Sequence, residues 1–232
     1  MQQSKKYLFI FAHPDDETSS SGGTMAKLVK QGHIIHVCVA TKGEEGSLGS
    51  GNFSVKRSDL PRVRERELRD VLEMYGTQPP VFLGYRDKQL EAIAQEELQE
   101  SVYRIINSVV PDFVITFGPS GISQHPDHIA IHKCVTAAFH IFQLQHSLCK
   151  LLYVAIPDSY NTFNLNLSEI ERHPNVVIDI ADEFKLKLAA LRNYKSQEDA
   201  QFLAEVFERN RIYFEAYSEW DVVGQHPVRG QF

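Results

Sequence analysis

The stretch Lys6–Gly23, KYLFIFAHPDDETSSSGG, decides the fold of this chain. Its first part, Lys6–Ala12, is an apolar and aromatic run that is too short for a stable helix and is typical of a strand buried on both faces. Polar residues end this run, and a segment of helical period, Gly23–Gln31, then stops before Gly32, which tolerates the left-handed backbone common after a helix. The stretch therefore predicts a strand, a loop and a helix.

The same alternation continues along the chain, and it is the signature of βαβ units around a mostly parallel sheet. We expect strands at Lys6–Ala12, Ile34–Ala40, Val81–Leu83, Phe113–Phe117, Leu151–Ala155 and Val176–Ile180. We expect helices at Gly23–Gln31, Pro61–Tyr75, Gln89–Val109, Asp127–Leu144, Ala181–Tyr194 and Asp199–Tyr217. No repeat, low-complexity tract or linker divides the sequence, so we predict an α/β, Rossmann-like three-layer sandwich with a single domain over residues 1–232.

Composition limits the classes of function. The 232 residues are 43% hydrophobic and 23% charged, which is typical of a globular protein. Lys and Arg number 24 against 30 Asp and Glu, giving a formal net charge of −6, so we expect no nucleic-acid partner. No run approaches the ~20 apolar residues that span a bilayer. The N-terminus turns polar before a signal-peptide core is complete, and the 3 cysteines are widely spaced, so we expect a cytoplasmic protein with reduced, buried cysteines.

Two loops rich in histidine and aspartate follow predicted strands. In the first, His13 and Asp16 are three residues apart, so one turn can direct both side chains at a single centre while Asp15 projects elsewhere. The second loop, HPDH, follows the strand Phe113–Phe117 and supplies His128. Because ligands bind at the carboxyl ends of strands in open α/β sheets, the two loops can converge. The alternative is ordinary solvated turn chemistry, which the second cluster disfavours.

Three protein ligands with one open position are typical of a catalytic zinc site. The natural set here is His13, Asp16 and His128. Two imidazoles and a carboxylate would also suit Fe(II). His125 would lie near the metal without binding it, and Asp127 is placed to hold one of its nitrogens. His132, four residues after His128, could replace either histidine of its loop, although a core or supporting role suits it better.

Three further features give weaker signals. Arg64 lies on a helix of alternating Arg and Glu residues, which usually form an exposed salt-bridged face, but a guanidinium near the helix start could grip a polar substrate group. The glycine-rich segment Lys42–Asp59 has no clean period and could be a lid. Ser19–Gly23 could cradle a phosphate, but it lacks the glycine fingerprint, and we expect N-capping hydroxyls and close helix packing there instead.

Four segments in this order resemble the PIG-L/LmbE-like N-acetylglucosaminyl deacetylase family: AHPDDE, SSGGTMAKLVKQGH, TKGEEGS and HPDH. Arg64, with Glu67 and the Tyr75-Gly76 ending, looks like the arginine-bearing helix of that family. The segment KLAALRNYKSQ, which ends at Gln197, looks like its C-terminal K-x-x-A-x-x-x-[HY]-x-S-Q motif.

The resemblance runs from about Lys6 to Gln197, with two departures. Tyr194 stands where many members of the family have His. No motif of the family matches over Lys150–Pro174.

The resemblance implies zinc at His13, Asp16 and His128, with Asp15 as general base, His125 as electrophilic helper and Arg64 as a substrate contact. It also implies assembly of several copies of the chain into a closed oligomer. We therefore expect hydrolysis of the N-acetyl amide of an N-acetylglucosamine-type sugar or glycoconjugate. Asp15 would take a proton from the attacking water, and a protonated His125 would stabilise the oxyanion.

Three alternatives stay open, the first within the same family and the other two from other classes of function. The chain could be an amidase acting on a larger thiol-sugar conjugate, or a metal-holding protein that binds a glycan without turning it over. Asp15 and His125 disfavour the second, because binding alone needs neither. A nucleotide-binding domain is disfavoured by the missing glycine fingerprint.

Overall fold

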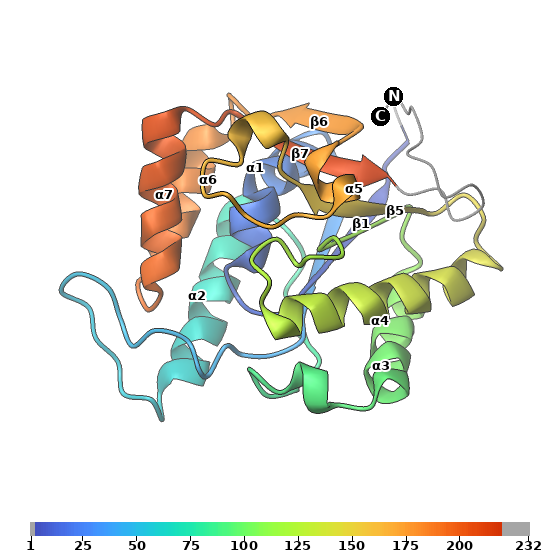
Figure 1. Ribbon diagram of the computed structural model, residues 1–232, viewed down its shortest axis with the longest axis horizontal. Helices are drawn as coiled ribbons and strands as arrows, with labels where there is room; N and C mark the ends of the chain where they lie inside the picture. The colour runs from blue at the N-terminus through green and yellow to red at the C-terminus, as the bar shows by residue number, and fades with distance from the viewer. Residues whose placement is uncertain (1–2, 220–232) are drawn as a thin grey trace.

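The computed structural model describes residues 3–219, in which seven strands form one sheet (Figure 1). The strands are β1 (Lys6–Phe11), β2 (Ile34–Val39), β3 (Val81–Phe82), β4 (Phe113–Thr116), β5 (Lys150–Ala155), β6 (Val176–Asp179) and β7 (Phe214–Glu219). Their order across the sheet is β3-β2-β1-β4-β5-β7-β6. The α/β class is confirmed, and each predicted strand is present within one residue of its expected ends. The single domain predicted over 1–232 includes 1–2 and 220–232, which lie outside the described residues.

The last strand corrects a predicted helix. The helix expected over Asp199–Tyr217 is wrong in its second half, because α7 (Glu198–Asn210) ends at Arg211, whose φ of 53° is left-handed, and β7 follows. β7 runs antiparallel between β5 and β6, whereas the strands from β3 to β5 are parallel. Pairing along both edges of β7 overrides its local helical period, which a sequence pattern does not reveal.

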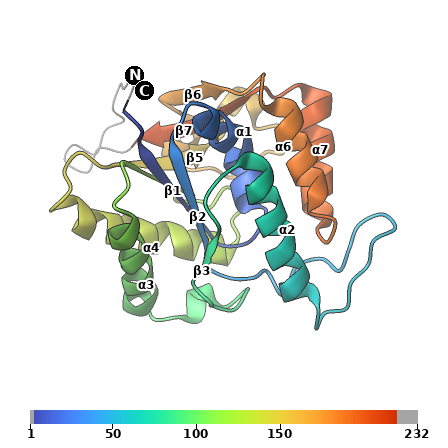
Figure 2. The same ribbon diagram turned by 180° about the vertical axis from the view of Figure 1, so that it is seen from behind.

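Helices cover both faces of the sheet (Figures 1 and 2). One layer consists of α1 (Asp16–Lys30), α2 (Leu60–Tyr75), α6 (Phe184–Asn193) and α7, with α1 packed on α2 and α6. On the other face α3 (Gln95–Val109) packs on α4 (Pro126–Gln143). The remaining helical pieces are short: η1 (Leu90–Ala92), η2 (Asp158–Tyr160) and α5 (Glu169–Arg172). The expected three layers are confirmed. Within residues 3–219, no helix combines the length and the apolar character needed to cross a bilayer.

Helix α1 begins earlier than the sequence indicates. The expected start at Gly23 is wrong: the helix starts at Asp16, so Ser19–Gly23 is helical and forms neither a capping loop nor a phosphate cradle. Close packing explains the glycines, as expected. A Cβ atom on Gly22 would lie 2.4 Å from Oη of Tyr75. Helix α2 can therefore approach α1 this closely only because residue 22 is a glycine without a side chain.

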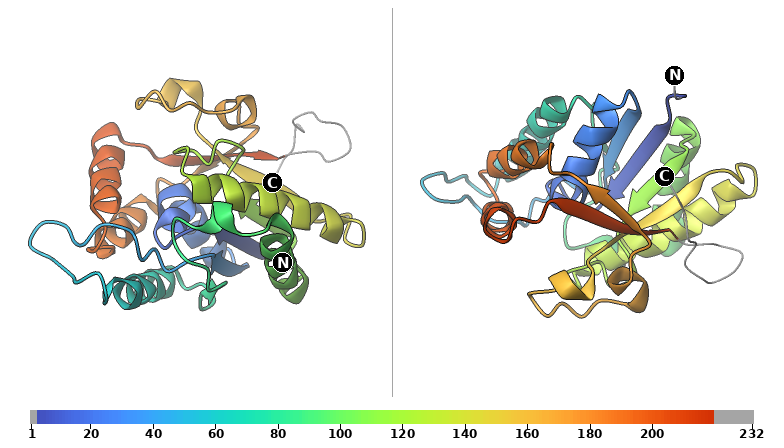
Figure 3. Two further views of the ribbon diagram at one scale, coloured as in Figure 1. Left: turned by 60° about the horizontal axis from the view of Figure 1, so that its bottom comes forward. Right: turned by 90° about the horizontal axis from the view of Figure 1, so that it is seen from above.

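The topology of the sheet reverses at β1. This strand lies between β2 and β4, with Phe11 opposite Val39 and Phe9 opposite Ile115. The chain continues from β1 into α1 on one face of the sheet. From β4 it continues into α4 on the opposite face (Figure 3). Open α/β sheets bind ligands in the crevice outside the carboxyl ends of such strands. Because the HPDD loop follows β1 and the HPDH loop follows β4, the fold brings both to this crevice.

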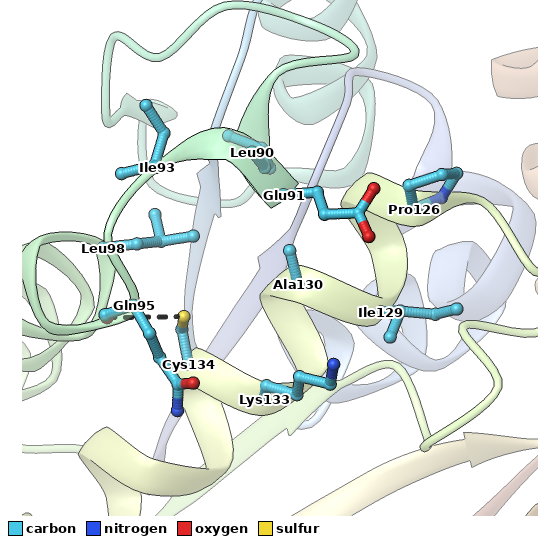
Figure 4. A pocket seen from close by; sticks show the side chains of 10 residues that line it. All are labelled: Leu90, Glu91, Ile93, Gln95, Leu98, Pro126, Ile129, Ala130, Lys133 and Cys134. Atoms are coloured by element: carbon cyan, nitrogen blue, oxygen red, sulfur yellow. Dashed lines mark hydrogen bonds between the residues drawn. The ribbon is translucent and has the colours of Figure 1, made fainter.

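A cavity of about 200 Å³ opens between η1, the start of α3 and α4 (Figure 4). The turn η1 precedes α3, so the helix predicted from Gln89 begins at Gln95 instead. Cys134 lines this cavity, with Sγ 3.8 Å from the carbonyl oxygen of Gln95. Cys38 and Cys149 are buried, and all three thiols are free. Burial raises the pKa of Cys38 and Cys149 to about 12 and that of Cys134 to about 11.

We expect the native protein to react slowly with a thiol-selective disulfide reagent, because the thiolate is the nucleophile and the raised pKa values leave little of it. Cys134 should react first, since it lines an open cavity, and Cys134→Ser should remove that phase. All three thiols should react at once in denaturant. The absorbance of the chromophoric thiolate released from the reagent measures each phase. Rapid reaction of Cys38 or Cys149 in the native protein would contradict their burial.

Candidate metal centre and catalytic site

The three predicted ligands come together at the edge of the sheet. His13 follows β1, Asp16 opens α1, and His128 lies in the first turn of α4. Nε2 of His128 is 3.3 Å from Nδ1 of His13 and 3.3 Å from Oδ1 of Asp16. Nδ1 of His13 is 3.5 Å from Oδ2 of Asp16. Each residue offers one donor atom, and these atoms lie within 4.8 Å of one another, a spacing that can hold a metal ion.

Contacts behind the two imidazoles determine which ring nitrogens face the cluster. Nδ1 of His128 lies 3.0 Å from a backbone carbonyl oxygen, which can only accept, so this nitrogen carries the proton. Nε2 of His13 lies 3.0 Å from Oδ1 of Asp87 and 3.2 Å from Oδ2 of Asp127. In the neutral form of each ring, the nitrogen that faces Asp16 therefore carries the lone pair. Two lone pairs and a carboxylate directed at one point are a suitable donor set for a divalent cation.

The charges in this cluster favour a bound cation. Burial raises the pKa of Asp16, but the neighbouring His128 and His13 outweigh burial and hold that pKa well below its usual range. Burial also lowers the pKa of His13, but its hydrogen bonds to Asp127, Asp16 and Asp87 outweigh burial and raise the pKa well above its usual value. The carboxylates thus create a site of negative potential that a proton or a metal ion can neutralise.

Asp127 is oriented differently from the prediction. Its fully buried carboxylate faces His13 rather than His125, and it also accepts the backbone N–H groups of Lys88 at 2.7 Å and Leu90 at 3.1 Å. The backbone N–H of Asp127 is what donates to Nδ1 of His125, at 3.1 Å, where His125 caps α4. The expected contact between the two residues exists, but the main chain makes it.

His125 is partly buried beside the cluster. Its ring centroid is 4.9 Å from that of His13 and 5.0 Å from that of His128. Burial and these two rings lower the pKa of His125. Because Nδ1 accepts an N–H group, the neutral ring carries its proton on Nε2. The lowered pKa and this contact favour a neutral His125 that donates through Nε2, whereas the sequence led us to expect a protonated ring.

Asp15 lies outside the ligand group and faces Arg64. Its Oδ2 accepts from Nη2 of Arg64 at 3.0 Å. Arg64 also donates to the carbonyl oxygens of Pro14 and Gly43, and it is only 4% exposed. Burial raises the pKa of Asp15 well above its usual value, and Arg64 opposes this shift only in part. Arg64 thus binds the protein's own carboxylate, and because it also lines the site cavity, its expected contact with substrate stays a prediction.

Sequence reasoning missed Asp87. It lies in the loop after β3, with Oδ1 facing His13 and Oδ2 accepting the backbone N–H of Glu45 at 3.0 Å. Glu45 belongs to the long loop, Lys42–Asp59, so Asp87 connects that loop to His13. Its position after a predicted strand, the same signal that marked His13, could have identified it.

The three candidate ligands line a cavity of about 490 Å³ together with Asp15, Arg64, Asp87 and His125. Its lining also includes Glu45–Ser47 of the long loop, Gln197 and Asp199. The backbone N–H of Ser47 donates to Oε1 of Gln197 at 3.2 Å, so the segment expected to be a lid is attached to the C-terminal part of the chain. His132 does not line this cavity, and its Nδ1 lies 2.9 Å from the carbonyl oxygen of Phe117.

Comparison with known protein families matches this chain to one of them. The family described as PIG-L: GlcNAc-PI de-N-acetylase matches residues 8–139, which is more than half of the chain and runs from β1 into α4. The chain belongs to the PIG-L family. Both histidine loops and the helix that carries Arg64 lie within the matched residues, whereas Tyr194 and Gln197 lie beyond them.

Relatives of this PIG-L protein share most of its length. A probable N-acetyl-α-D-glucosaminyl L-malate deacetylase 2 of Bacillus cereus is 31% identical over 193 residues, which are 83% of this chain and 84% of that protein. The structure of N,N′-diacetylchitobiose deacetylase from Pyrococcus horikoshii matches with a TM-score of 0.70 at 25% identity, over 94% of this chain and 84% of that one. A 4-carboxy-2-hydroxymuconate hydratase from Pseudomonas putida has a TM-score of 0.72 at 18% identity, over 98% and 100%, which shows a common fold alone. Activity must therefore be argued from the site.

We expect Asp127→Asn to weaken Zn²⁺ binding by about 10- to 100-fold, because an amide cannot accept at both oxygen positions and would release the His13 ring from its orientation. Competition with a chromophoric chelator measures the affinity on the intact protein. Asp158→Asn, which removes one partner of an exposed ion pair with Arg172, is the matched control and should bind as wild type does. Equal affinities of the two variants would show that Asp127 does not orient the ligand.

Proposed function

We propose that this PIG-L family member is a zinc-dependent hydrolase that removes the N-acetyl group from an N-acetylglucosamine-type sugar or glycoconjugate. One observation carries the proposal: a donor set of two imidazoles and one carboxylate shares a cavity with a separate buried carboxylate, that of Asp15. The relatives from Bacillus cereus and Pyrococcus horikoshii, which are named as deacetylases of N-acetylglucosaminyl compounds, support the same chemistry.

The residues fit zinc. His13, Asp16 and His128 would hold the ion, since two imidazoles and a carboxylate are ligands that zinc prefers and three protein ligands leave one position open. The same set suits Fe(II), so the choice of zinc is part of the proposal. When bound, the metal supplies a positive charge that acidifies water and polarises the amide carbonyl.

Asp15 is the residue that moves the proton. Its Oδ1 takes a proton from the attacking water, because Oδ2 is bound to Arg64. Burial raises the pKa of Asp15, and a general base is most effective when its pKa approaches the working pH. Protonated Asp15 then returns the proton to the departing amine nitrogen, so the products are acetate and the free amino sugar.

The remaining residues orient these groups or stabilise charge. Neutral His125 lines the cavity and offers its Nε2–H to the oxyanion of the tetrahedral intermediate. A donor in that position contributes about 3–4 kcal/mol to transition-state stabilisation in comparable enzymes. Arg64 orients Asp15, while Asp127 and Asp87 hold the ring of His13.

We expect two neighbouring isosteric variants to separate metal binding from proton transfer. Asp15→Asn should keep its zinc content and lose about 10²- to 10⁴-fold in kcat, because only the base is removed. Asp16→Asn should lose zinc affinity, because a ligand is removed. Acetate release from N-acetylglucosamine, N-acetylglucosaminyl malate and diacetylchitobiose measures turnover, with metal analysis on the same samples.

Two outcomes would overturn the proposal. One is a zinc-loaded wild-type protein that releases no acetate from any of these compounds. The other is an Asp15→Asn variant that turns over as fast as the wild type at equal zinc content.

A further inference from the structure

Asp15 has a backbone conformation that residues with a Cβ avoid. Its φ of 90° and ψ of −24° place it in the left-handed region at the start of α1. L-residues other than glycine rarely adopt this conformation, although aspartate tolerates it better than most. The side chain of Asp15 makes no capping hydrogen bond to the helix. Its surroundings must therefore hold the conformation.

The peptide group between Pro14 and Asp15 is held at both ends. Its carbonyl oxygen accepts a hydrogen bond from Nη2 of Arg64. Its N–H donates to Oε2 of Glu17 at 3.0 Å. A peptide group is planar, so fixing these two atoms fixes the plane that precedes the Cα of Asp15. The carbonyl oxygen of Asp15 accepts from the backbone N–H groups of Thr18 and Ser19, which holds the peptide group that follows. The two planes together fix φ and ψ of Asp15 and the direction of its Cα–Cβ bond.

Glu17 is held in turn by two hydroxyl groups. Its Oε1 accepts from Oη of Tyr194 at 2.5 Å and from Oγ1 of Thr18 at 2.6 Å. Glu17 and Tyr194 are both 0% exposed. These three donors fill most of the roughly four acceptor positions of the carboxylate and compensate in part for the loss of water around it. Tyr194 lies between α6 and α7, so a distant part of the chain reaches Asp15 through a single carboxylate.

We propose that Glu17 and Tyr194 are positioning residues that hold Asp15 in the orientation needed for proton transfer. The inference rests on the proposed role of Asp15 as the base. Neither Glu17 nor Tyr194 lines the cavity, so both act through Asp15 rather than on substrate. A histidine at position 194 could also donate a hydrogen bond to Glu17.

The structure offers a matched control for a merely structural role. Tyr217 is a second buried tyrosine whose hydroxyl binds α1, donating to Oγ1 of Thr24 at 2.9 Å, but it makes no contact with Asp15 or Glu17. Tyr217→Phe and Tyr194→Phe each remove one buried hydroxyl bound to the same helix. A general loss of stability would affect both variants alike.

The experiment compares kcat, KM and zinc content of the holoenzyme variants below their melting temperatures. We expect Tyr194→Phe to lower kcat by about 10- to 100-fold, the loss typical of a misplacement of about 1 Å, with KM and zinc content within about twofold of wild type. Tyr194→His should recover part of this loss, and Tyr217→Phe should keep the wild-type kcat. If Tyr194→Phe does not fold, Thr18→Val removes the other hydroxyl on the same oxygen and should show the same loss.

Hydrogen exchange provides a measurement that does not require turnover. The peptide covering residues 12–19 should exchange faster in Tyr194→Phe than in the wild type and at the wild-type rate in Tyr217→Phe. Three outcomes would overturn the positioning role. They are unchanged exchange in Tyr194→Phe, equal losses of kcat in both Phe variants, and a change in KM without a change in kcat. Faster exchange in a protein whose wild type releases no acetate would instead overturn the proposed function while supporting the contact with Asp15.

Discussion

Buried negative charge is the constraint on which this site depends. Asp15, Asp16, Glu17, Asp87 and Asp127 lie in or directly behind one cavity, and none is more than 8% exposed. A carboxylate removed from water must find hydrogen-bond donors or a cation, or it is strongly destabilising. Asp127 finds backbone N–H groups, Asp15 finds Arg64, and Glu17 finds hydroxyls. Asp16 accepts the backbone N–H of His13 and faces two imidazoles, where a proton or a metal ion can supply the positive charge.

The sequence predicted those features of the fold and site that depend on neighbours along the chain. The apolar run of β1 and the three-residue spacing of His13 and Asp16 are local, and both led to the correct element or grouping. The strand β7 and the glycines inside α1 could not be assigned in this way, because β7 depends on pairing with β5 and β6, and Gly22 on close packing against Tyr75. Such tertiary contacts routinely override local preference.

The same distinction separates the ligands from the groups that orient them. A histidine in a motif can be recognised from the sequence. The carboxylate that orients its ring cannot, because that contact depends on how separate loops pack together. The carboxylate of Asp127 faces a histidine 114 positions away, and Asp87 reaches the same ring from the loop after β3. Spacing could suggest that Asp127 contacts its neighbour His125, but only the fold shows that the main chain makes that contact.

The residues that carry the proposed chemistry lie in the first part of the chain, whereas several that hold them lie beyond Phe139, where the family match ends. Glu171 binds the backbone N–H of Ser120 in the loop before α4, Ser196 binds Glu67 on α2, and Tyr194 binds Glu17. Grafting only the two histidine loops onto another parallel sheet would transfer the donor atoms without the contacts that aim them. The site could therefore be transferred to another protein only with the folded chain from His13 to Gln197, and not as a short motif.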